Sequence, residues 1–459
     1  MEAFIKYNLE IDEIKESFKF EKGLTHSHGH KYKLLPYVAN EKTLVSEFSG
    51  VVGSFSRVIS DKRLTKEFKV EDFLVEISEQ VGEYEGDLAE DTFKDIIRTM
   101  FIDNGRLIEF DINTMNYISS TSADEKIANF LYSVLFDDSL KEDVKNQYDK
   151  ESENILYKLV LKSLPKLKDE VTSIDEYNCY LPYVKELFIK DFKFILSRDD
   201  LYRNSVKRLL EYYYLFYVSQ LIMKLNQFEK ADLTKPSRLY YTLDWERTSK
   251  TRTAYQFGWE KLKSSIGTLF SHAITLEMLN HSTIEQPLGY KDLAQVLSTN
   301  SSDDWINSIQ KLIKSYQDNI KIDWENFKFA NKETEIPGFN LVYQLFNTIK
   351  YQFDHSSRAR ANDAYTNWFV KFVQANFAKR RGQLGYNLNI TEDDIILMTK
   401  ICINNSEKLK LNTLFEEFEA RGLFFDQDSR SKIIQLYEKL NLLEKKSDSG
   451  DAQYVKSVL

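Results

Sequence analysis

The sequence predicts a mainly α-helical protein with three regions: a small N-terminal α+β part (1–124), a central multi-helical bundle (125–387) and a C-terminal module of three helices and a β-hairpin (388–459). Two observations support this prediction. Only 15 glycines and 6 prolines occur among 459 residues, so residues that interrupt helices are sparse. From about residue 125 to residue 385, apolar side chains recur at helical spacing in one segment after another.

The composition excludes several classes of protein. With 42% apolar and 29% charged residues, the chain is typical neither of a disordered protein nor of a membrane protein. Its net charge of −9 excludes a general nucleic-acid binder, so contact with DNA would need a local cluster of Lys and Arg. Cys179 and Cys402 match no metal-site spacing, and such sparing use fits a reducing cytosol. No signal-peptide or membrane-span pattern occurs, and we expect a soluble, cytoplasmic protein without cofactors.

A histidine-rich loop follows an amphipathic opening segment. His26, His28 and His30 alternate, so their imidazoles would share one face of an extended strand, a pattern that can bind a metal. No Cys, Asp or Glu lies close by to complete a set of ligands, and Gly29 loosens the backbone. We therefore predict a solvent-exposed loop and no metal.

The rest of the N-terminal region combines helices with one hairpin. A helix is predicted over 48–58, where Gly50 and Gly53 would let another backbone approach closely, and no glycine completes a nucleotide-binding Walker A pattern. Nine acidic residues occur from Glu71 to Asp91 without a Lys or Arg. Apolar spacing there predicts a helix whose acidic outer face is either solvated or meets a basic partner. Asn104-Gly105, between apolar runs, predicts a β-hairpin.

Helices fill the central region. Apolar spacing predicts a helix over 155–164 and a long one over 203–225 that is apolar on most sides and should be buried. Over 254–279 the spacing predicts a single long helix, capped by Thr251 or Thr253.

The stretch 235–263 interleaves aromatic and basic side chains in an acidic protein. Seven Lys or Arg stand against three Asp or Glu, which gives a local charge of about +4. Such a stretch can stack on bases while neutralising phosphates, or provide the buried anchors of a protein interface. Alternatively, the rings belong to the core and the cations to a solvated face. The candidate contacts are Arg238, Trp245, Arg247, Lys250, Arg252 and Trp259.

A second basic patch lies over 358–382, where Asp363 is the only acidic residue and Trp and Phe interleave again. Five of its cations are candidate contacts for DNA or a partner: Arg358, Arg360, Lys379, Arg380 and Arg381. We also predict that the last three end a helix, because cations favour the negative end of the helix dipole and Gly382 can end the final turn.

Three helices and a hairpin are predicted after residue 391. Thr391 begins the first helix, the second ends near Arg421, and the third begins at Asp428. Their order resembles a winged helix, whose third helix can enter the DNA major groove. Winged helices also dock proteins, and this module has a net charge of −3, so both readings stay open. The candidate contacts are Arg430, Lys432, Lys439, Lys445 and Lys446.

Several short motifs resemble a known family. They are Lys33-Leu34-Leu35-Pro36-Tyr37, Phe48-Ser49-Gly50-Val51-Val52-Gly53, Leu239-Tyr240-Tyr241-Thr242-Leu243-Asp244-Trp245-Glu246 and Thr248-Ser249-Lys250-Thr251-Arg252. On these residues the chain resembles the DptG (DndG) family, subunits of the bacterial phosphorothioation-dependent restriction system. The resemblance implies a component of antiviral defence that acts with DptF-like and DptH-like subunits. Those partners carry the nucleotide-hydrolysing and DNA-processing activities, and the cell's own sulfur-modified DNA is spared.

The expected role is therefore a non-catalytic adaptor that contributes DNA contacts through the two basic patches. Two other functions stay open. A metal-dependent nuclease needs an Asp and a Glu-x-Lys that converge on one metal, and Asp61 with Glu67 and Lys69 supplies those residue types. A transcriptional regulator would use the winged helix to bind one promoter sequence without a stable protein partner.

Overall fold

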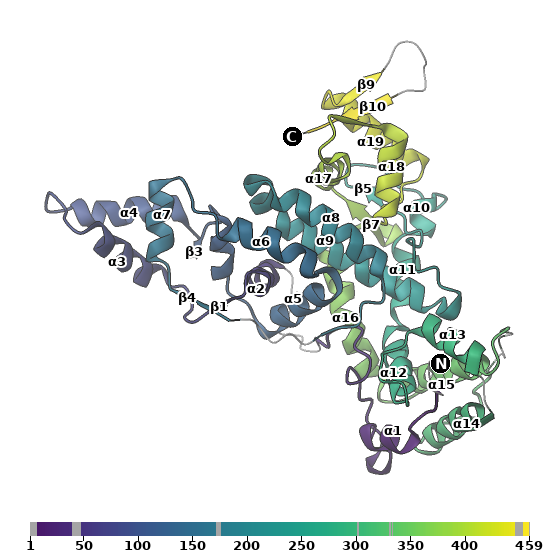
Figure 1. The fold of residues 1–459 in the computed structure, drawn as a ribbon. Helices are drawn as coiled ribbons and strands as arrows, with labels where there is room; N and C mark the ends of the chain where they lie inside the picture. Colours follow the sequence, from purple (N-terminus) through teal and green to yellow (C-terminus); the bar gives the residue numbers. More distant parts are fainter. Residues whose placement is uncertain are drawn as a thin grey trace, which may run out of the picture.

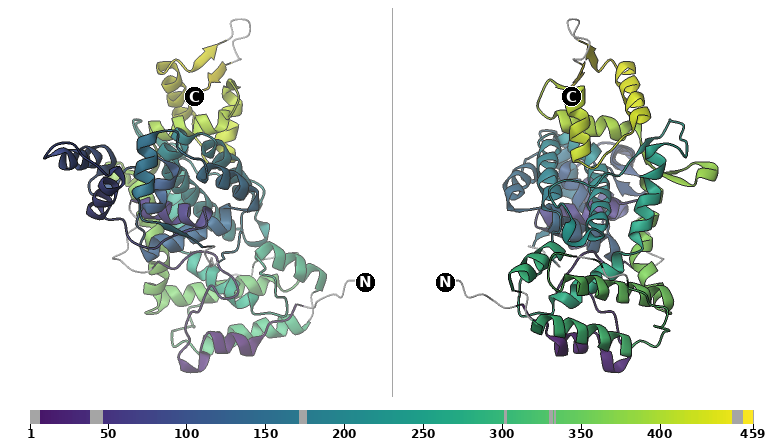
Figure 2. Two further views of the ribbon diagram at one scale, coloured as in Figure 1. Left: turned by 60° about the vertical axis from the view of Figure 1, so that its left-hand side comes forward. Right: turned by 90° about the vertical axis from the view of Figure 1, so that its right-hand side faces the viewer.

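In a computed structural model the chain is mainly helical and divides into an arm, a central bundle, a lower helical layer and a C-terminal module (Figure 1). The structure describes residues 7–38, 47–170, 176–300, 303–329, 332, 334–445 and 453–458. Two further views show the same parts from other sides, with the C-terminal hairpin farthest from the lower layer (Figure 2). Among the described residues, no helix is both long and apolar enough to cross a membrane.

Helix α9 (Asp199–Leu225) runs through the main hydrophobic core, as the sequence predicts. Twenty of its 27 residues are buried, which explains why apolar side chains cover most of its circumference. The predicted close approach at Gly53 is confirmed, because a Cβ there would overlap the carbonyl of Ile118. Helix α8 (Pro182–Leu196) packs most extensively against α9, and the bundle also contains α2 (Ser49–Ile59), α5 (Ser122–Leu135) and α6 (Lys141–Tyr148).

The N-terminal segment 7–38 lies along the lower helical layer (Figure 1). The hydroxyl of Tyr7 donates a hydrogen bond to the carbonyl of Leu279 at 2.6 Å, although these residues are 272 positions apart in sequence. The helices here are α1 (Ile11–Ser17), α12 (Leu269–Asn280), α13 (Tyr290–Asn300), α14 (Asp303–Asp318), α15 (Phe339–His355) and α16 (Ala359–Asn376).

The prediction of an exposed histidine loop is wrong for His26 and His28. The ring of His26 lies against Tyr316 and Phe353, and burial lowers its pKa to about 3. The loop is held by Glu277 of α12, a buried carboxylate that accepts hydrogen bonds from four consecutive backbone amides, residues 29 to 32, at 3.0–3.2 Å. Tyr316 and Phe353 lie 290 and 327 residues after His26, so local spacing could not indicate them.

The single helix predicted over 254–279 is also wrong. The chain forms α10 (Thr253–Gln256), α11 (Trp259–Ile266) and then α12. Gly258 separates the first two, because the carbonyl of Tyr240 approaches to 2.7 Å from where a Cβ would stand. Neither predicted threonine caps α10, whose N-cap is Arg252.

The arm has a hydrophobic core of its own, centred on Phe73, Ile77, Phe101 and Val160. This core joins residues before and after 124, so it does not follow the boundary expected from the sequence. The hairpin at Asn104-Gly105 is confirmed. The elements of the arm and its base are β1 (Lys62–Leu64), α3 (Val70–Val81), α4 (Ala89–Phe101), β2 (Ile102–Asp103), β3 (Arg106–Leu107), α7 (Ile155–Ser163) and β4 (Leu167–Asp169).

The C-terminal module contains three helices and a three-stranded antiparallel sheet of order β8-β10-β9. Thr391 caps the first helix in a capping box with Asp394, as predicted, but the third helix is capped by Asp426 rather than begun at Asp428. The elements are α17 (Glu392–Ile403), β8 (Lys408–Lys410), α18 (Leu411–Ala420), α19 (Gln427–Lys439), β9 (Leu443–Lys445) and β10 (Gln453–Lys456).

A second small sheet connects the central region to this module. Its order is β5-β7-β6, from β5 (Thr242–Leu243), β6 (Ala378–Arg380) and β7 (Tyr386–Ile390). The predicted helix end over 379–381 is wrong, because α16 has already ended at Asn376 and the following residues pair with β7.

Candidate functional site

The basic–aromatic stretch lies where the central region meets the C-terminal module, around β5 and α11 (Figure 1). Its backbone joins three segments. The amide of Tyr240 donates to Phe257 at 3.1 Å, that of Tyr241 to Phe424 at 2.9 Å, and that of Asp244 to Ile390 at 3.1 Å. The side chains of this stretch are therefore carried on a backbone that is fixed from several directions.

Part of the stretch forms an exposed set that we call the basic–aromatic surface. Trp245 is 42% exposed and Phe257 is 46% exposed, which is unusual for such large rings. Among the described residues, no acidic side chain forms an ion pair with Arg238, Arg247 or Lys250. The basic–aromatic surface consists of Arg238, Trp245, Arg247, Lys250, Phe257 and Lys263.

Arg252 does not belong to this surface. Its side chain is only 10% exposed, and its guanidinium bonds Glu246 at 2.7 Å, Ser429 at 2.9 Å and the carboxylate of Asp426. Burial of Asp426 opposes its ionisation, but the hydrogen bonds from Arg252 and the Ser429 amide outweigh burial and lower the pKa of that carboxyl. Arg252 is thus an internal link between the loop before α10 and the first turn of α19.

Trp259 is buried as well. It is 2% exposed, and its ring lies 6.0 Å from that of Tyr386 on β7. Trp259 therefore belongs to the core, which was the alternative interpretation of the aromatic rings in this stretch. Trp245 and Phe257 are exposed and can contact a ligand.

Two more arginines, Arg421 and the partly exposed Arg208, fix the C-terminal module to the central bundle. Arg421, at the end of α18, pairs with Asp191 of α8, and both side chains are fully buried. Arg208 of α9 bonds both oxygens of Asp394 at 2.6 and 2.8 Å, and it lies 4.1 Å from the Phe377 ring centroid. These two links between the module and the bundle were not predicted from the sequence. The available signal was an acidic residue within an apolar helix, as at Asp191, because a buried charge needs a partner.

The second basic patch is divided by the fold. Lys379 pairs with Asp244, and Arg381 donates to the carbonyl of Leu243 at 2.9 Å, so both connect the β6 side of the sheet to the end of β5. Arg380 between them is exposed and pairs in the sheet with Tyr386 of β7. Lys379 and Arg381 are therefore fixed to the two residues that precede Trp245 in the chain.

Arg358 and Arg360 lie at the opposite end of α16. Arg358 bonds the carbonyl of Gly23 and approaches the Nδ1 atom of His26 at 3.3 Å, whereas Arg360 is exposed. This pair therefore does not share a surface with Lys379.

In the C-terminal module, two of the four candidate cations that the structure describes are paired with acids. Arg430 pairs with Glu419 and covers the Phe415 ring at 4.8 Å, and Lys445 pairs with Glu438 at 2.8 Å. Two others are exposed: Lys432, which donates to the side chain of Gln435, and Lys439. Lys446 lies outside the described residues.

The residues considered for a nuclease lie on the surface of the protein. Asp61, Glu67 and Lys69 are all exposed, in the turn before β1 and the loop after it. Within the described part of the chain, no three His, Cys, Asp or Glu side chains are grouped so that they could hold a metal ion.

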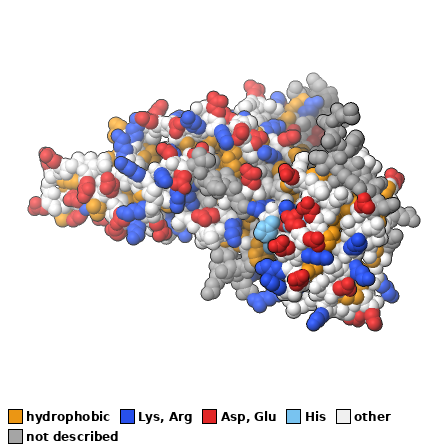
Figure 3. Space-filling view, turned by 60° about the horizontal axis from the view of Figure 1, so that its bottom comes forward, with side chains coloured by type: hydrophobic (Ala, Val, Ile, Leu, Met, Phe, Trp, Pro, Cys, Tyr) orange, Lys and Arg blue, Asp and Glu red, His pale blue; other side chains and the backbone are white. Residues whose placement is uncertain are grey.

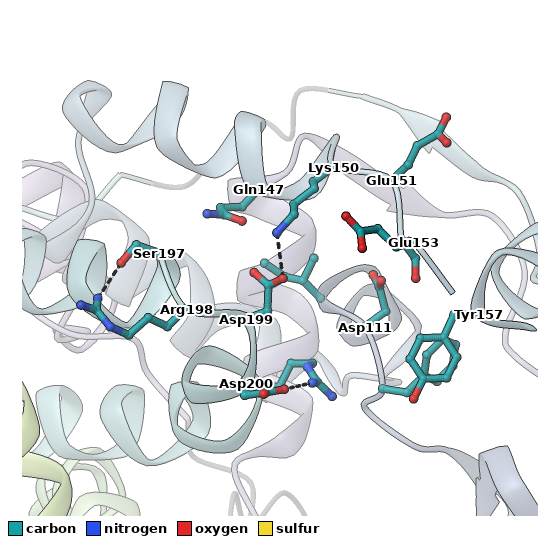
Figure 4. Close-up of a pocket in the computed structure, with 14 residues that line it drawn as sticks. Asp111, Gln147, Lys150, Glu151, Glu153, Tyr157, Ser197, Arg198, Asp199 and Asp200 are labelled. Atoms are coloured by element: carbon teal, nitrogen blue, oxygen red, sulfur yellow. Dashed lines mark hydrogen bonds and ion pairs between the residues drawn. The ribbon is translucent and has the colours of Figure 1, made fainter. Parts of the chain in front are cut away.

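An open pocket of about 620 Å³ lies between the arm and the start of α9 (Figure 4). Its charges are largely satisfied by one another: Lys150 pairs with Asp199 at 3.0 Å, and Arg203 pairs with Asp200. Asp111 accepts the amide of Asn113 at 2.9 Å and so caps a short helical turn. In Figure 4 Glu153 points into the space without a dashed contact to the residues drawn. This arrangement provides polar contacts among the side chains that line the pocket.

No protein-family model matches this chain, and no curated protein matches it either.

Proposed function

We propose that the chain is a non-catalytic adaptor in a bacterial phosphorothioation-dependent DNA restriction complex, where it contacts DNA and joins DptF-like and DptH-like subunits. The restriction context rests on the motif resemblance at residues 33–37, 48–53 and 239–252. The proposed DNA contact rests on one observation, the exposed cations of the basic–aromatic surface with two exposed rings among them.

This surface suits nucleic acid for two physical reasons. Cations without acidic partners can neutralise phosphates and release the condensed counterions, which supplies affinity independent of sequence. Exposed Trp245 and Phe257 can each stack on a base, and stacking tolerates any base. Arg380, which is exposed on the opposite edge of the β5-β7-β6 sheet, is a further cation available for such a contact. Because the rest of the chain is acidic, DNA would be directed to this area.

We infer that the module 391–458 is winged-helix-like and docks protein rather than DNA. Its order of helices and strands, α17, β8, α18, α19, β9 and β10, supports the first part. Helix-turn-helix proteins usually contact bases with the first residues of the recognition helix. In this chain the first turn of α19 is occupied by Arg252, and Arg430 and Lys445 are paired with acids. Both observations favour a protein partner.

The DNA contact is tested with the purified full-length chain and fluorescent single- and double-stranded oligonucleotides, titrated at several salt concentrations. The triple variant Arg238→Ala, Arg247→Ala, Lys250→Ala should weaken DNA binding about tenfold or more. For duplex DNA, the slope of the logarithm of the binding constant against the logarithm of the salt concentration should become less steep by roughly two to three. Its matched control removes three exposed lysines elsewhere, as Lys311→Ala, Lys314→Ala, Lys321→Ala. Equal losses in the two triple variants, or no loss in either, would contradict the assignment.

A further inference from the structure

Most of the exposed apolar side chains lie on the arm. Among the described residues, nine large hydrophobic side chains are exposed, and six of them belong to α3, α4, α7 or the loop between α3 and α4. Single exposed apolar residues are ordinary, whereas a group of them on one small element marks an interaction site. The six are Val75, Val81, Leu88, Ile96, Met100 and Ile155.

On α4 these residues form part of a stripe. Ile96 and Met100 lie one helical turn apart and are 50% and 47% exposed, whereas Phe93, one turn before Ile96, packs against the core of the arm. Ile97 and Phe101 of the same helix point into the core of the arm. Helix α4 therefore has one apolar side that the arm uses and a second, adjacent apolar side that the described chain leaves open.

The same segment carries almost all of the net charge of the protein. Residues 70–101 contain ten acidic and two basic residues, so their net charge of −8 compares with −9 for the whole chain. Both basic residues are already engaged, Lys94 with Glu90 at 2.6 Å and Arg98 with Glu71 at 3.0 Å. At the left-hand end of Figure 3, acidic and hydrophobic side chains alternate over the arm.

We propose that the arm is a docking surface for a basic amphipathic helix of a protein partner. The apolar stripe of α4 would receive the apolar side of that helix, in the way that an amphipathic helix fits an apolar groove. The acidic residues of 70–101 would attract its Lys and Arg and exclude DNA, which has the same sign of charge. The proposal rests on the proposed function in that the partner is taken to be another subunit of the same complex.

A second copy of this chain is the competing occupant, because its own basic–aromatic surface has the opposite charge. That surface is built from loops, a short sheet and α11 rather than from an amphipathic helix with a basic face. If the arm of one copy bound the basic–aromatic surface of the next, the contact would repeat from copy to copy. It would give an open filament unless the rotation between copies closed a ring. The charge and the helical stripe together favour a different protein.

The test uses the full-length chain and a fluorescent 18-residue peptide of Leu and Lys in an amphipathic helical pattern. Wild-type protein should bind this peptide, and Ile96→Gln, Met100→Gln should weaken binding at least tenfold while its melting curve stays unchanged. A scrambled peptide of the same composition should bind weakly to both proteins. The control Leu440→Gln, at another exposed apolar position, should bind like wild type. Equal binding of the amphipathic peptide by wild type and the double variant would overturn the proposal.

Sedimentation velocity distinguishes binding of a second copy from binding of a different protein. Concentration-dependent assembly of wild-type protein that disappears in Ile96→Gln, Met100→Gln would assign the surface to a second copy and overturn the proposal; a monomer in both supports it. The double variant should also keep wild-type affinity for DNA. Loss of peptide binding thus tests the arm alone, whereas failure of the wild-type chain to bind DNA tests the proposed function.

Discussion

Arg421 and Asp191 form an ion pair in which neither side chain is exposed to solvent. The guanidinium donates from Nε and Nη2 to the two carboxylate oxygens at 2.8 and 2.7 Å, and the Tyr213 hydroxyl donates to the same carboxylate at 2.6 Å. The pair joins the end of α18 to α8, residues separated by 230 positions in sequence. The C-terminal module is therefore built onto the central bundle through buried charges as well as apolar contacts.

Removing one member of this pair should strongly destabilise the protein. In Arg421→Met, Asp191 would remain buried without its counter-charge, and the free energy of unfolding should fall by about 3–5 kcal/mol. Urea denaturation followed by fluorescence measures the change. The exposed pair of Lys193 and Asp143 is the control, since Lys193→Ala should lower the free energy of unfolding by less than about 1 kcal/mol. Similar losses in both variants would contradict the special role of the buried pair.

The basic–aromatic stretch should separate into binding and structural residues. Arg247→Ala with Lys250→Ala changes only exposed cations, so the free energy of unfolding should stay within about 0.5 kcal/mol while DNA affinity falls. Arg252→Ala leaves Glu246 and Asp426 without their shared partner and should cost about 3 kcal/mol or more. Thermal unfolding and fluorescence anisotropy on the same preparations measure both effects. An Arg252→Ala protein of wild-type stability would contradict this division.

Glu277 should be essential for the histidine loop. Gln has the same shape, but its NH₂ group is a donor and would face some of the backbone amides of residues 29–32. Glu277→Gln should therefore cost about 2 kcal/mol or more, because buried amide donors lose their acceptor. Hydrogen exchange of those four amides should accelerate in the variant. Unchanged protection would show that the carboxylate is not their acceptor.

His272 should make stability depend on pH. Burial, with a smaller effect from Lys332, lowers its pKa to about 3 in the folded chain. The unfolded chain, with a histidine pKa of about 6.5, takes up the proton first, so this contribution is complete above pH 6.5 and is lost as the pH falls towards 3. Over that range, each decrease of one pH unit should lower the free energy of unfolding by about 1.4 kcal/mol.

The variant His272→Gln removes this titration and should flatten the dependence of the free energy of unfolding on pH between 6 and 5. Urea midpoints at the two pH values give the slope. An equal slope in wild type and variant would mean that His272 is accessible to protons in the folded protein.

Local patterns could be predicted well from the sequence. The helix at 48–58, the Asn104-Gly105 hairpin and the Thr391 cap depend on neighbours within a few residues. The buried α9 and the close approach at Gly53 involve distant partners, but the apolar periodicity of the helix and the small size of glycine indicate them without naming those partners. Such features follow from periodicity and turn chemistry, which the sequence states directly.

Distant partners could not be predicted. Arg252 looks like an exposed cation until Asp426 is placed beside it, and His26 looks like a loop residue until Tyr316 and Phe353 enclose it. The helix expected through Gly258 fails for the same reason, because the approaching backbone belongs to Tyr240. In each case the deciding contact is set by tertiary packing, which overrides local preference.

The central claim, that this chain is an adaptor between DNA and other subunits, is tested most directly by purifying the tagged full-length protein from its own host at low salt. Bound proteins are identified by mass, with nuclease treatment to separate contacts made through DNA from direct ones. We predict that DptF-like and DptH-like subunits remain bound after nuclease treatment and are reduced in Ile96→Gln, Met100→Gln. A chain recovered without these subunits would contradict the adaptor role.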